Sequence, residues 1–494
     1  MIRFLINQES VEIEDVRADL TLLQFIREYR HKTGTKEGCA AGDCGACTVV
    51  LAEPNADFSA LHYRTVNSCI TLMSAVHAKQ LIFVEHLSNG ATLHPVQQAL
   101  VDHHGSQCGF CTPGFIMSIF ALYNTNSSPN RDDVLHALSG NLCRCTGYRP
   151  IIDATLAVCE QQADDGFTRN TSSTLSTLKA IATRDSVGGD YMGGDYMGGD
   201  YVGTRNLIMP RHRKSLAKAI KDNPAARLVS GSTDLSLTFT QQLKNIDTLI
   251  SLSQMDELKV CTTTSHSLII GAANPIKDIT QALLKYFSQL AELITRFASL
   301  PIRNQATLGG NIANASPIGD MPPALIALNA AILVDNGTQK RSIPVTEFFV
   351  GYRETALKSD EWIAAIEIPF LSANQRLAAY KISKRFEDDI SAVCAVFNVT
   401  INQGIIEQVD AGFGGVAATP ASCNALHDAL VGKNFSSKAC VDLGKTVLMN
   451  AFTPIDDVRA TAEYRKTVLA NLWHRFWLEN QSDTTITTRV MNHA

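Results

Sequence analysis

The sequence predicts a multidomain α+β protein, and three observations indicate this class. The chain has 494 residues, which is enough for about three to four domains. Eight of its 13 cysteines lie in two quartets between residues 39 and 145, in a region that reads first as strands and then as helices. From residue 207 onward, short apolar strands alternate with helical segments.

Residues 1–78 are predicted to form a small β-grasp domain. The strand-like runs 2–6 and 11–14 flank a turn-forming segment, as in a β-hairpin. Residues 21–29 then carry apolar side chains at helical spacing. A cysteine-containing loop and the strand-like run 48–51 complete the pattern.

Residues 79–162 read as a bundle of helices. Pro95 stands where the first residue of a helix is expected, and Thr112-Pro113 opens a second helix as cap and first residue. A third helix is expected from Asn130 to Gly140. Both pairs of the second cysteine quartet therefore lie at helix ends, where loops can converge.

Residues 163–205 are rich in Ser, Thr and Gly, and they contain the tandem units GGDYM, GGDYM and GGDYV between residues 188 and 202. This composition indicates a flexible linker that a short duplication has lengthened. A binding role for the repeated Tyr and Asp residues is the alternative.

Two further domains are expected after the linker. An α+β domain spans residues 206–376, with its clearest strands at 226–229, 248–250, 267–270 and 331–334. A last α+β domain, residues 380–494, begins with strands and ends in helices, the last of which carries Trp473, Phe476 and Trp477.

The first cysteine quartet has the spacing of a plant-type ferredoxin site. Cys39, Cys44 and Cys47 follow the pattern C-x4-C-x2-C, and Cys69 comes 22 residues later. Thiolates are soft anionic ligands that suit an iron–sulfide core, and four of them enclose a two-iron cluster. A zinc site is the alternative, although zinc sites usually show paired C-x2-C knuckles.

The second quartet is less specific by itself. It consists of Cys108 and Cys111 in a C-x2-C pair, followed by Cys143 and Cys145 in a C-x-C pair. Zinc is an open alternative because C-x2-C occurs with both metals. The neighbouring ferredoxin-like domain favours a second iron–sulfur cluster. The other five cysteines, which show no regular spacing, are expected to be small buried side chains: Cys159, Cys261, Cys394, Cys423 and Cys440.

The overall composition excludes several classes of protein. A formal net charge of -5 gives no reason to expect nucleic-acid or anionic-membrane binding. The N-terminus lacks the features of a signal peptide, and no apolar run is long enough to span a membrane. A reducing cytoplasm is therefore the expected location, which disfavours a disulfide framework.

Two glycine-bearing turns lie between apolar runs in the second half, at residues 229–234 and 307–311. Backbone N–H groups in such turns can hold a pyrophosphate, although most glycine turns are simply turns. No G-x-G-x-x-G follows a strand, so a Rossmann-type site is not supported. Lys381 and the acidic run 387–389 fit an ordinary solvated loop, which is where charge runs usually lie.

Taken together, these residues resemble the molybdenum hydroxylase (xanthine oxidase) family, most closely the small iron–sulfur and FAD subunits of its bacterial xanthine dehydrogenases. The resemblance covers nearly the whole chain. It rests on the ordered motifs EGCAAGDCGAC (37–47), NSC (67–69), QCGFCTPG (107–114), GNLCRCTGYRP (140–150), TLGGNIANASPIGD (307–320) and GYR (351–353).

The resemblance implies a role for each matching residue. The first quartet would hold a 2Fe-2S cluster nearer the flavin, and the second quartet a 2Fe-2S cluster facing a molybdenum centre. Gln107 would lie near the molybdopterin, and Tyr352 and Asp388 near NAD. The implied FAD contacts, in a domain of the PCMH type followed by a flavoprotein domain of the CO-dehydrogenase type, are Leu228, Val229, Ser230, Gly231, Ser232, Thr233, Asp234, Leu235, Phe297, Thr307, Leu308, Gly309, Gly310, Asn311, Asn314, Asp320, Ile363 and Lys381.

The same resemblance implies an incomplete catalytic assembly. By this resemblance the chain would contain no catalytic residue for hydroxylation. That step would take place on a large molybdopterin-binding partner, in a heterotetramer of two small and two large subunits. Xanthine or hypoxanthine would be oxidised there, and electrons would pass through both clusters to FAD and then to NAD. The alternatives are a related subunit for aldehyde or N-heterocycle oxidation, a stand-alone iron–sulfur flavoprotein NADH reductase, and a structural zinc protein.

Overall fold

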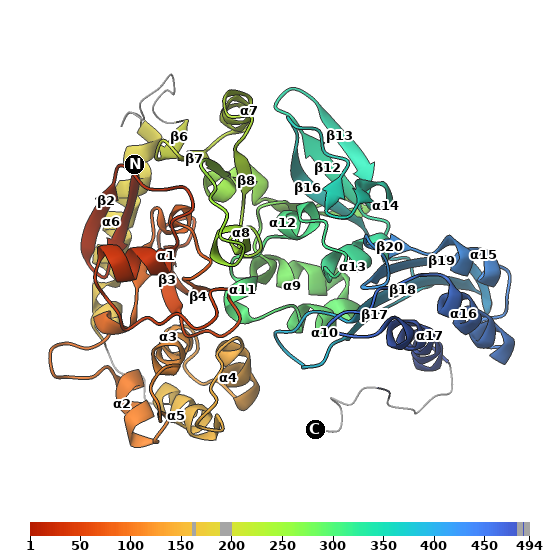
Figure 1. Cartoon of the computed structure of the whole chain (residues 1–494), viewed down its shortest axis with the longest axis horizontal. Coiled ribbons are helices and arrows are strands. Elements are labelled where there is room, and N and C mark those ends of the chain that lie inside the picture. The colour runs from red at the N-terminus through yellow and green to blue at the C-terminus, as the bar shows by residue number, and fades with distance from the viewer. Residues whose placement is uncertain (161–164, 188–199, 482–487, 489–494) are drawn as a thin grey trace. The chain divides into compact units, whose positions relative to one another are not determined.

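The computed structural model describes residues 1–160, 165–187, 200–481 and 488 (Figure 1). The chain divides into two compact units. Unit 1 comprises residues 1–257, 275–277 and 298–306, and unit 2 comprises residues 258–274, 278–297 and 307–494. Each unit is described by itself.

The N-terminal part of unit 1 is a five-stranded sheet with the order β2-β1-β5-β3-β4. β1 pairs antiparallel with β2 and parallel with β5, and β3 pairs antiparallel with both β4 and β5. Its strands are β1 (Ile2–Ile6), β2 (Glu9–Ile13), β3 (Thr48–Pro54), β4 (Leu61–Asn67) and β5 (Gln80–Ile82). The predicted hairpin and β-grasp arrangement are confirmed. β5 lies beyond residue 78, so the sheet extends past the expected boundary.

A helical segment crosses this sheet at the expected place. The helix α1 (Leu22–Gln24) continues directly as a π-helix over Phe25–Tyr29. Thr21 caps α1 by accepting a hydrogen bond from the backbone N–H of Gln24, which satisfies a donor that the first helical turn leaves free. Phe25 packs edge-on against Phe4 of β1.

Four helices follow in unit 1: α2 (Pro95–Asp102), α3 (Thr112–Tyr123), α4 (Arg131–Leu138) and α5 (Arg149–Cys159). Pro95 is the first residue of α2, as the sequence predicts, and Asn130 caps α4 together with Asp133. α3 is buried almost throughout and forms the centre of the bundle. The helical-bundle prediction is confirmed.

The expectation of a flexible linker over residues 163–205 is wrong for much of that stretch. Residues Gly166–Val187 form the 22-residue helix α6, and Tyr201–Gly203 form strand β6. Leu178 and Ile181 of α6 pack against Leu5 of β1. The helix therefore has a narrow apolar face, although its overall composition is polar. The tandem GGDYM units lie almost entirely at residues 188–199, outside the described residues.

A second sheet completes unit 1, with the order β6-β7-β9-β8. Its core is continuous with that of the first sheet, because Met209 and Leu249 belong to the same apolar cluster as Phe4 and Leu81. The predicted strands at 226–229 and 248–250 are confirmed as β8 and β9. The remaining elements of unit 1 are β7 (Leu207–Pro210), α7 (Arg213–Asp222), β8 (Arg227–Val229), α8 (Leu237–Thr240), β9 (Leu249–Ser251) and α11 (Leu300–Arg303).

Unit 2 contains a five-stranded sheet with the order β10-β11-β16-β12-β13. The predicted strands at 267–270 and 331–334 are confirmed as β11 and β12. The strands and helices of this part are β10 (Cys261–Thr263), β11 (Ser267–Gly271), α9 (Ile276–Tyr286, whose first two residues belong to unit 1), α10 (Ala291–Thr295), α12 (Leu308–Ala313), α13 (Met321–Ala327), β12 (Ala331–Asp335), β13 (Lys340–Pro344), α14 (Val345–Phe348), β14 (Phe349–Gly351), β15 (Glu354–Thr355) and β16 (Trp362–Pro369).

The C-terminal part of unit 2 is an antiparallel sheet, β17-β18-β19-β20, with helices α15 to α17. Trp473 and Phe476 of α17 pack against Phe397 of β18, as expected for an amphipathic helix on a sheet. The elements are β17 (Gln375–Ile382), β18 (Val393–Asn402), β19 (Ile405–Gly414), β20 (Ala421–Ser422), α15 (Asn424–Leu430), α16 (Lys438–Asn450) and α17 (Ala462–Glu479).

The five cysteines outside the quartets do not all behave as expected. Cys159, Cys394 and Cys440 are buried, and Cys423 is partly buried. Cys261 is exposed, so the prediction is wrong for this residue. Cys261 lies on β10, an edge strand whose three residues all face solvent.

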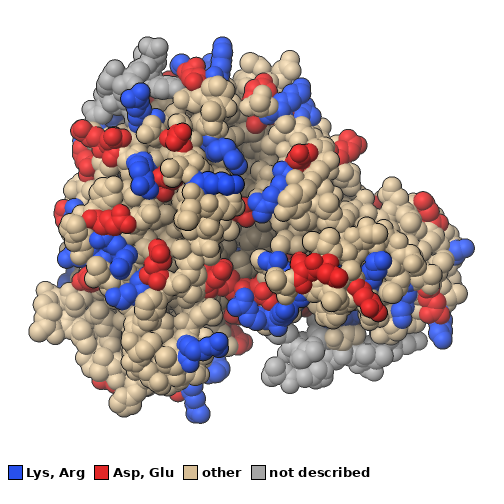
Figure 2. Space-filling model, in the orientation of Figure 1, with Lys and Arg blue, Asp and Glu red and all other residues tan. Residues whose placement is uncertain are grey.

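The surface of the molecule mixes both signs of charge. Figure 2 shows acidic and basic side chains interspersed over the face in view, which agrees with a net charge of -5. Within the described residues, no helix has the length and apolar character needed to cross a membrane.

Arg465 of α17 holds two loops of the C-terminal part together. Its side chain is buried, and its Nη1 donates to the carbonyl oxygens of Ala392 (2.6 Å) and Gly415 (2.8 Å). Its Nη2 donates to Asp457 at 2.6 Å. Buried carbonyl groups that lose their donors are costly, because water cannot replace the lost hydrogen bonds.

We expect Arg465→Met to lower the free energy of unfolding of the C-terminal part by about 3 kcal/mol. In hydrogen-exchange mass spectrometry, peptides from β18, β19 and α17 should exchange faster, and peptides from unit 1 should not change. Arg376→Met is the matched control, because exposed Arg376 donates only to nearby carbonyl groups such as that of Ala373. Equal exchange in the two variants would contradict the prediction.

Candidate functional site

The first cysteine quartet lies where the loop after the π-helix meets the turn after β4. Cys39, Cys44 and Cys47 are on the loop that leads into β3, and Cys69 follows β4. Thr48 of β3 pairs with Asn67 of β4, and this pairing brings the adjacent cysteines together. The sulfur atoms of Cys47 and Cys69 are 3.3 Å apart, and both residues are buried.

The thiols of this quartet influence one another's ionisation. Hydrogen bonding from the Cys44 and Cys69 thiols lowers the pKa of Cys39, whereas the Cys39 thiol raises the pKa of Cys44. The Cys39 and Cys47 thiols likewise raise the pKa of Cys69. The quartet thus combines thiols that ionise readily with partners that hold their protons, and a bound cation would relieve the repulsion among four thiolates.

The loop also directs backbone donors at sulfur. The N–H groups of Ala41 and Asp43 donate to Cys39 Sγ at 3.4 Å and 3.3 Å. Gly42 and Gly45 have φ angles of 83° and 69°, in the region that favours glycine. These glycines allow the loop to turn tightly between the cysteines.

Asn67 provides a test of whether the site fits an iron–sulfur cluster. Its side chain is fully buried, and within the described residues neither its Nδ2 nor its Oδ1 makes a hydrogen bond. It lies two residues before Cys69, whose thiol hydrogen bond lowers the pKa of Cys47. A buried amide needs a partner, and the sulfur atoms of a cluster would supply an acceptor there. The residues therefore fit such a group.

The second quartet is formed by two loops at the ends of helices. Cys108 and Cys111 precede α3, and Cys143 and Cys145 lie between α4 and α5. The thiol of Cys108 raises the pKa of Cys145, and burial together with Cys143 raises the pKa of Cys111 to about 12. Cys108 and Cys145 are exposed, unlike the buried pair of the first quartet.

Among the described residues, no three or more His, Cys, Asp or Glu side chains surround a single metal-ion position. The sulfur contacts described above are pairwise. The assignment of the eight individual cysteines as ligands therefore stays a prediction.

The two cysteine loops are joined by direct hydrogen bonds. The backbone N–H of Leu142, next to Cys143, donates to the carbonyl oxygen of Cys44 at 3.0 Å. Asn141 is buried, and its Nδ2 donates to the carbonyl oxygen of Gly45 at 3.2 Å. Sequence reasoning missed Asn141, although its position in the GNLCRC motif, two residues before a predicted ligand, was a usable signal.

Close packing prevents these loops from separating. A Cβ atom on Gly114 of α3 would lie 2.1 Å from the carbonyl oxygen of Gly45. The side chain of Ser118 donates to Asn141 Oδ1 at 2.6 Å, so α3 holds Asn141 in place from the opposite side. The two loops therefore form one hydrogen-bonded body, which we call the cysteine-loop joint.

The first predicted flavin segment, residues 228–235, lies in unit 1 after β8. A Cβ on Gly231 would meet the carbonyl oxygen of Gln305 at 1.9 Å, so only glycine fits there. The hydroxyl groups of Ser232 and Ser236 both donate to the carbonyl oxygen of Ile70, at 2.8 Å and 2.7 Å. Ile70 follows Cys69, so this segment is tied to the neighbour of a predicted ligand. Sequence reasoning did not identify Ser236.

The second predicted flavin segment, residues 307–311, lies in unit 2 and opens α12. Thr307 caps the helix by accepting a hydrogen bond from Gly310 N–H at 3.1 Å. A Cβ on Gly309 would lie 2.5 Å from Cβ of Ala272. Asn311 Oδ1 is buried and makes no hydrogen bond within the described residues. Gly309 is therefore needed for close packing, whether or not this segment also contacts a ligand.

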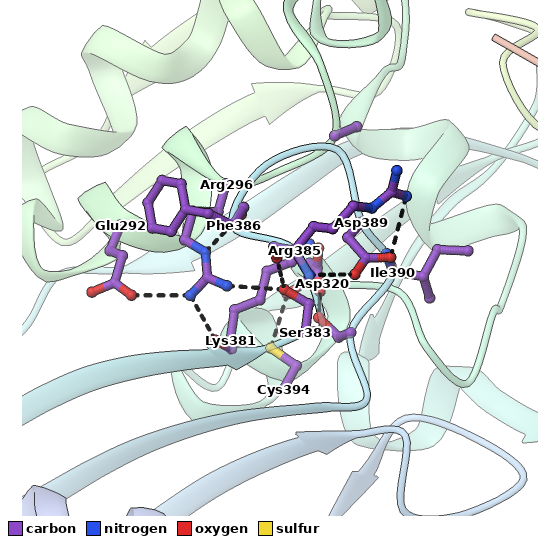
Figure 3. A network of polar contacts seen from close by, with 12 residues as sticks. Glu292, Arg296, Asp320, Lys381, Ser383, Arg385, Phe386, Asp389, Ile390 and Cys394 are labelled. Carbon is purple, nitrogen blue, oxygen red and sulfur yellow. Dashed lines mark hydrogen bonds and ion pairs between the residues drawn. The ribbon is translucent and has the colours of Figure 1, made fainter. Parts of the chain in front are cut away.

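Two of the predicted flavin contacts in unit 2 form a buried ion pair. Lys381 is 3% exposed, and its Nζ lies 2.5 Å from Asp320 Oδ2 (Figure 3). The hydroxyl of buried Ser391 donates to the other oxygen of Asp320. Lys381 is therefore not part of a solvated loop, which corrects that interpretation. Glu387, further along, is exposed as an ordinary loop residue would be.

Arg296 organises the loop that follows Lys381. Its guanidinium group donates to the carbonyl oxygens of Lys381 (2.7 Å) and Phe386 (3.1 Å) and to the hydroxyl of Ser383 (2.9 Å). It also lies over the Phe386 ring, 4.7 Å from its centre. Figure 3 shows these groups converging on Arg296. Sequence reasoning missed this residue because its partners lie about 90 positions away.

The remaining predicted site residues are spread over both units. In unit 2, Phe297 and Ile363 are buried, Asn314 and Asp388 are partly buried, and Tyr352 is 64% exposed. In unit 1, Gln107 is exposed beside Cys108.

Four family descriptions match successive parts of the chain. They are the 2Fe-2S iron-sulfur cluster binding domain (residues 4–74), the 2Fe-2S binding domain (83–156), the FAD binding domain in molybdopterin dehydrogenase (203–371) and the CO dehydrogenase flavoprotein C-terminal domain (378–480). One cysteine quartet falls in each 2Fe-2S domain.

Curated relatives match almost the entire chain. Xanthine dehydrogenase of Emericella nidulans is 32% identical over 522 residues, which cover 96% of this chain and 38% of that protein. Xanthine dehydrogenase 1 of Arabidopsis thaliana is 29% identical, covering 94% and 38%. Aldehyde oxidase 2 of Rattus norvegicus is 28% identical, covering 97% and 39%. The chain thus spans well under half the length of these relatives.

Solved structures agree with the fold. Carbon monoxide dehydrogenase from Hydrogenophaga pseudoflava matches 55% of this chain and 94% of its own chain, with a TM-score of 0.52 and 23% identity. Quinoline 2-oxidoreductase from Pseudomonas putida 86 matches 56% of this chain and 97% of its own, with a TM-score of 0.51 and 21% identity.

We expect Asn141→Leu to weaken the cysteine-loop joint, because Gly45 and Ser118 lose a buried hydrogen-bond partner at a cost of about 2 kcal/mol. Hydrogen exchange should accelerate in residues 39–48 and at the start of α3. Asn124→Leu is the control, since Asn124 only caps the end of α3 through Phe120. An Asn141 variant that exchanges no faster than this control would show that the joint does not depend on Asn141.

Proposed function

This chain belongs to the molybdenum hydroxylase family, with two 2Fe-2S domains and an FAD-binding domain, and on that premise we propose that it is the electron-transfer subunit of a xanthine dehydrogenase. In this proposal the chain takes electrons from a molybdenum centre on a partner subunit, where hypoxanthine and xanthine are hydroxylated to urate, and delivers them to NAD. Bound 2Fe-2S clusters would supply one-electron transfer, and bound FAD would supply hydride transfer.

The observation that carries this proposal is the hydrogen bond from Leu142 N–H to the carbonyl oxygen of Cys44. Each of the two quartets contributes a ligand or the neighbour of a ligand to this bond. It joins the two loops directly, and clusters bound to both quartets would then be held close to one another. A stand-alone structural site would have no need for that connection.

A second connection continues toward the flavin. Ser232 and Ser236 both donate to the carbonyl oxygen of Ile70, which follows Cys69. The first quartet is thereby linked on one side to the second quartet and on the other side to the predicted flavin segment. This order supports a relay in which the first quartet stands between the second quartet and the flavin.

The exposure of the second quartet supports a large molybdopterin-binding partner. Cys108 and Cys145 face solvent, and three exposed apolar side chains lie near them in sequence: Phe110, Leu142 and Tyr148. Exposed apolar groups around a redox centre are typical of a surface that another subunit covers. We propose that Gln107, also exposed, faces the molybdopterin, and that two small and two large subunits assemble.

We propose that the eight quartet cysteines hold the clusters and that the two flavin segments, with Phe297, Asn314, Asp320, Ile363 and Lys381, contact FAD. The buried Asp320–Lys381 pair supports this, because it places two predicted FAD contacts side by side. Tyr352 and Asp388 are proposed to lie near NAD. Thirteen free cysteines support a reducing location such as the cytoplasm.

The second candidate is a subunit for aldehyde oxidation. Aldehyde oxidase 2 of Rattus norvegicus matches 97% of this chain at 28% identity, close to the values for the xanthine dehydrogenases. The substrate would bind to the partner in either case, so the residues of this chain do not separate the two candidates.

Purification of the chain together with its native partners tests the function directly. We expect a large molybdenum-containing subunit and the formation of urate with xanthine and NAD. Aldehyde-dependent activity without urate would favour the second candidate. A chain that is found alone, and that reduces only dyes with NADH, would exclude both.

Cys145→Ser should separate the two halves of the relay. We expect NADH–dye activity through FAD to stay largely intact, whereas xanthine-to-NAD turnover stops, because the second cluster loses a ligand. Cys261→Ser is the control, since Cys261 is also exposed but stands outside both quartets. Equal loss of both activities in Cys145→Ser would mean that the second quartet is structural for the whole subunit.

A further inference from the structure

Thr146, directly after Cys145, places its hydroxyl group against a predicted cluster ligand. Thr146 Oγ1 donates to Cys143 Sγ at 3.1 Å, and the backbone N–H of Thr146 donates to the same sulfur at 3.4 Å. The hydroxyl oxygen also accepts a hydrogen bond from the N–H of Tyr148 at 3.2 Å. Because the oxygen accepts from Tyr148, its single hydrogen is directed at the sulfur.

The surrounding backbone holds this hydroxyl group in position. Gly147 and Tyr148 have φ angles of 71° and 67°, so two successive residues have a positive φ. Such a conformation is unfavourable for a tyrosine and persists only where other contacts maintain it. The Tyr148 hydroxyl provides one of these contacts by accepting a hydrogen bond from Cys143 N–H at 2.8 Å. Thr146 and Tyr148 therefore hold Cys143 from two directions.

A donor at a ligand sulfur affects the two redox states of a cluster unequally. Reduction adds negative charge, part of which resides on the thiolate ligands, and a hydrogen bond stabilises that charge. The reduced state gains more than the oxidised state, so the reduction potential rises.

We propose that Thr146 is a positioning residue that raises the reduction potential of the second 2Fe-2S cluster through its hydrogen bond to Cys143 Sγ. This inference rests on the proposed function, because it requires that the second quartet holds such a cluster. It identifies how the chain adjusts electron transfer at the entry to its relay. A side-chain donor can be removed by substitution, unlike the backbone donors of Ala41 and Asp43 at Cys39.

The test is a redox titration of the full chain with its partners, followed by electron paramagnetic resonance. The signal of the second cluster is assigned by its loss in Cys145→Ser. We expect Thr146→Val, which removes the hydroxyl and keeps the shape, to move the midpoint of the second cluster to lower potential. Thr146→Ser, which keeps the hydroxyl, should restore the wild-type midpoint. The first cluster should titrate unchanged in both variants.

Thr125→Val is the matched control. Its hydroxyl also makes a hydrogen bond in the helical part of unit 1, to the carbonyl oxygen of Ala121 at 2.8 Å, but it does not contact a quartet cysteine through that bond. We expect no change of either midpoint in this variant.

Three outcomes would overturn the inference: an unchanged second midpoint in Thr146→Val, an equal shift of both clusters, or a failure of Thr146→Ser to restore the midpoint. Loss of the second cluster from both Thr146→Val and Thr146→Ala would also overturn it, since Thr146 would then serve assembly rather than potential. A wild-type chain without 2Fe-2S clusters would instead refute the proposed function, so the two failures are distinguishable.

Discussion

The hydrogen-bonded joint between the two cysteine loops is the constraint on which the candidate site of unit 1 depends. Leu142 N–H meets the carbonyl oxygen of Cys44, and Asn141 meets that of Gly45. A side chain at Gly114 would collide with the carbonyl oxygen of Gly45, so glycine is needed at this position. A β-grasp sheet and a helical bundle are thereby joined at the point where their cysteine loops meet. A buried and paired polar contact such as that of Asn141 favours one arrangement, because other arrangements leave the carbonyl oxygen of Gly45 unpaired.

The same principle operates at the next step along the chain. The carbonyl oxygen of Ile70 accepts from both Ser232 and Ser236, so a residue next to Cys69 is fastened to the segment after β8. In unit 2, Arg296 and the Asp320–Lys381 pair perform a comparable task around the loop after β17. Ser236 and Arg296, which are not among the predicted cofactor contacts, thus hold residues that are next to them or part of them.

Sequence reasoning predicted the local secondary structure more reliably than the contacts between distant segments. The cysteine quartets, the N-terminal hairpin and the starts of α2 and α3 follow from spacing, turns and proline, which act over a few residues. The helix α6 was not predicted, because its Ser- and Thr-rich composition is typical of a linker and only a few apolar residues, among them Leu178 and Ile181, indicate a buried face. Cys261 was expected to be buried, but it lies on an edge strand, and sheet order is a property of distant residues.

By itself, the sequence determined which residues can ligate metal, where the helices begin and which family the motifs resemble, because these depend on residue type and local spacing. Only the tertiary structure decided that Asn141 joins two loops 96 residues apart, that Ser236 reaches Ile70 across 166 positions and that Lys381 is buried against Asp320. Such contacts arise when distant segments pack together, and their energy comes from burying polar groups with satisfied partners. The order of residue types along the chain does not show which distant segments pack together.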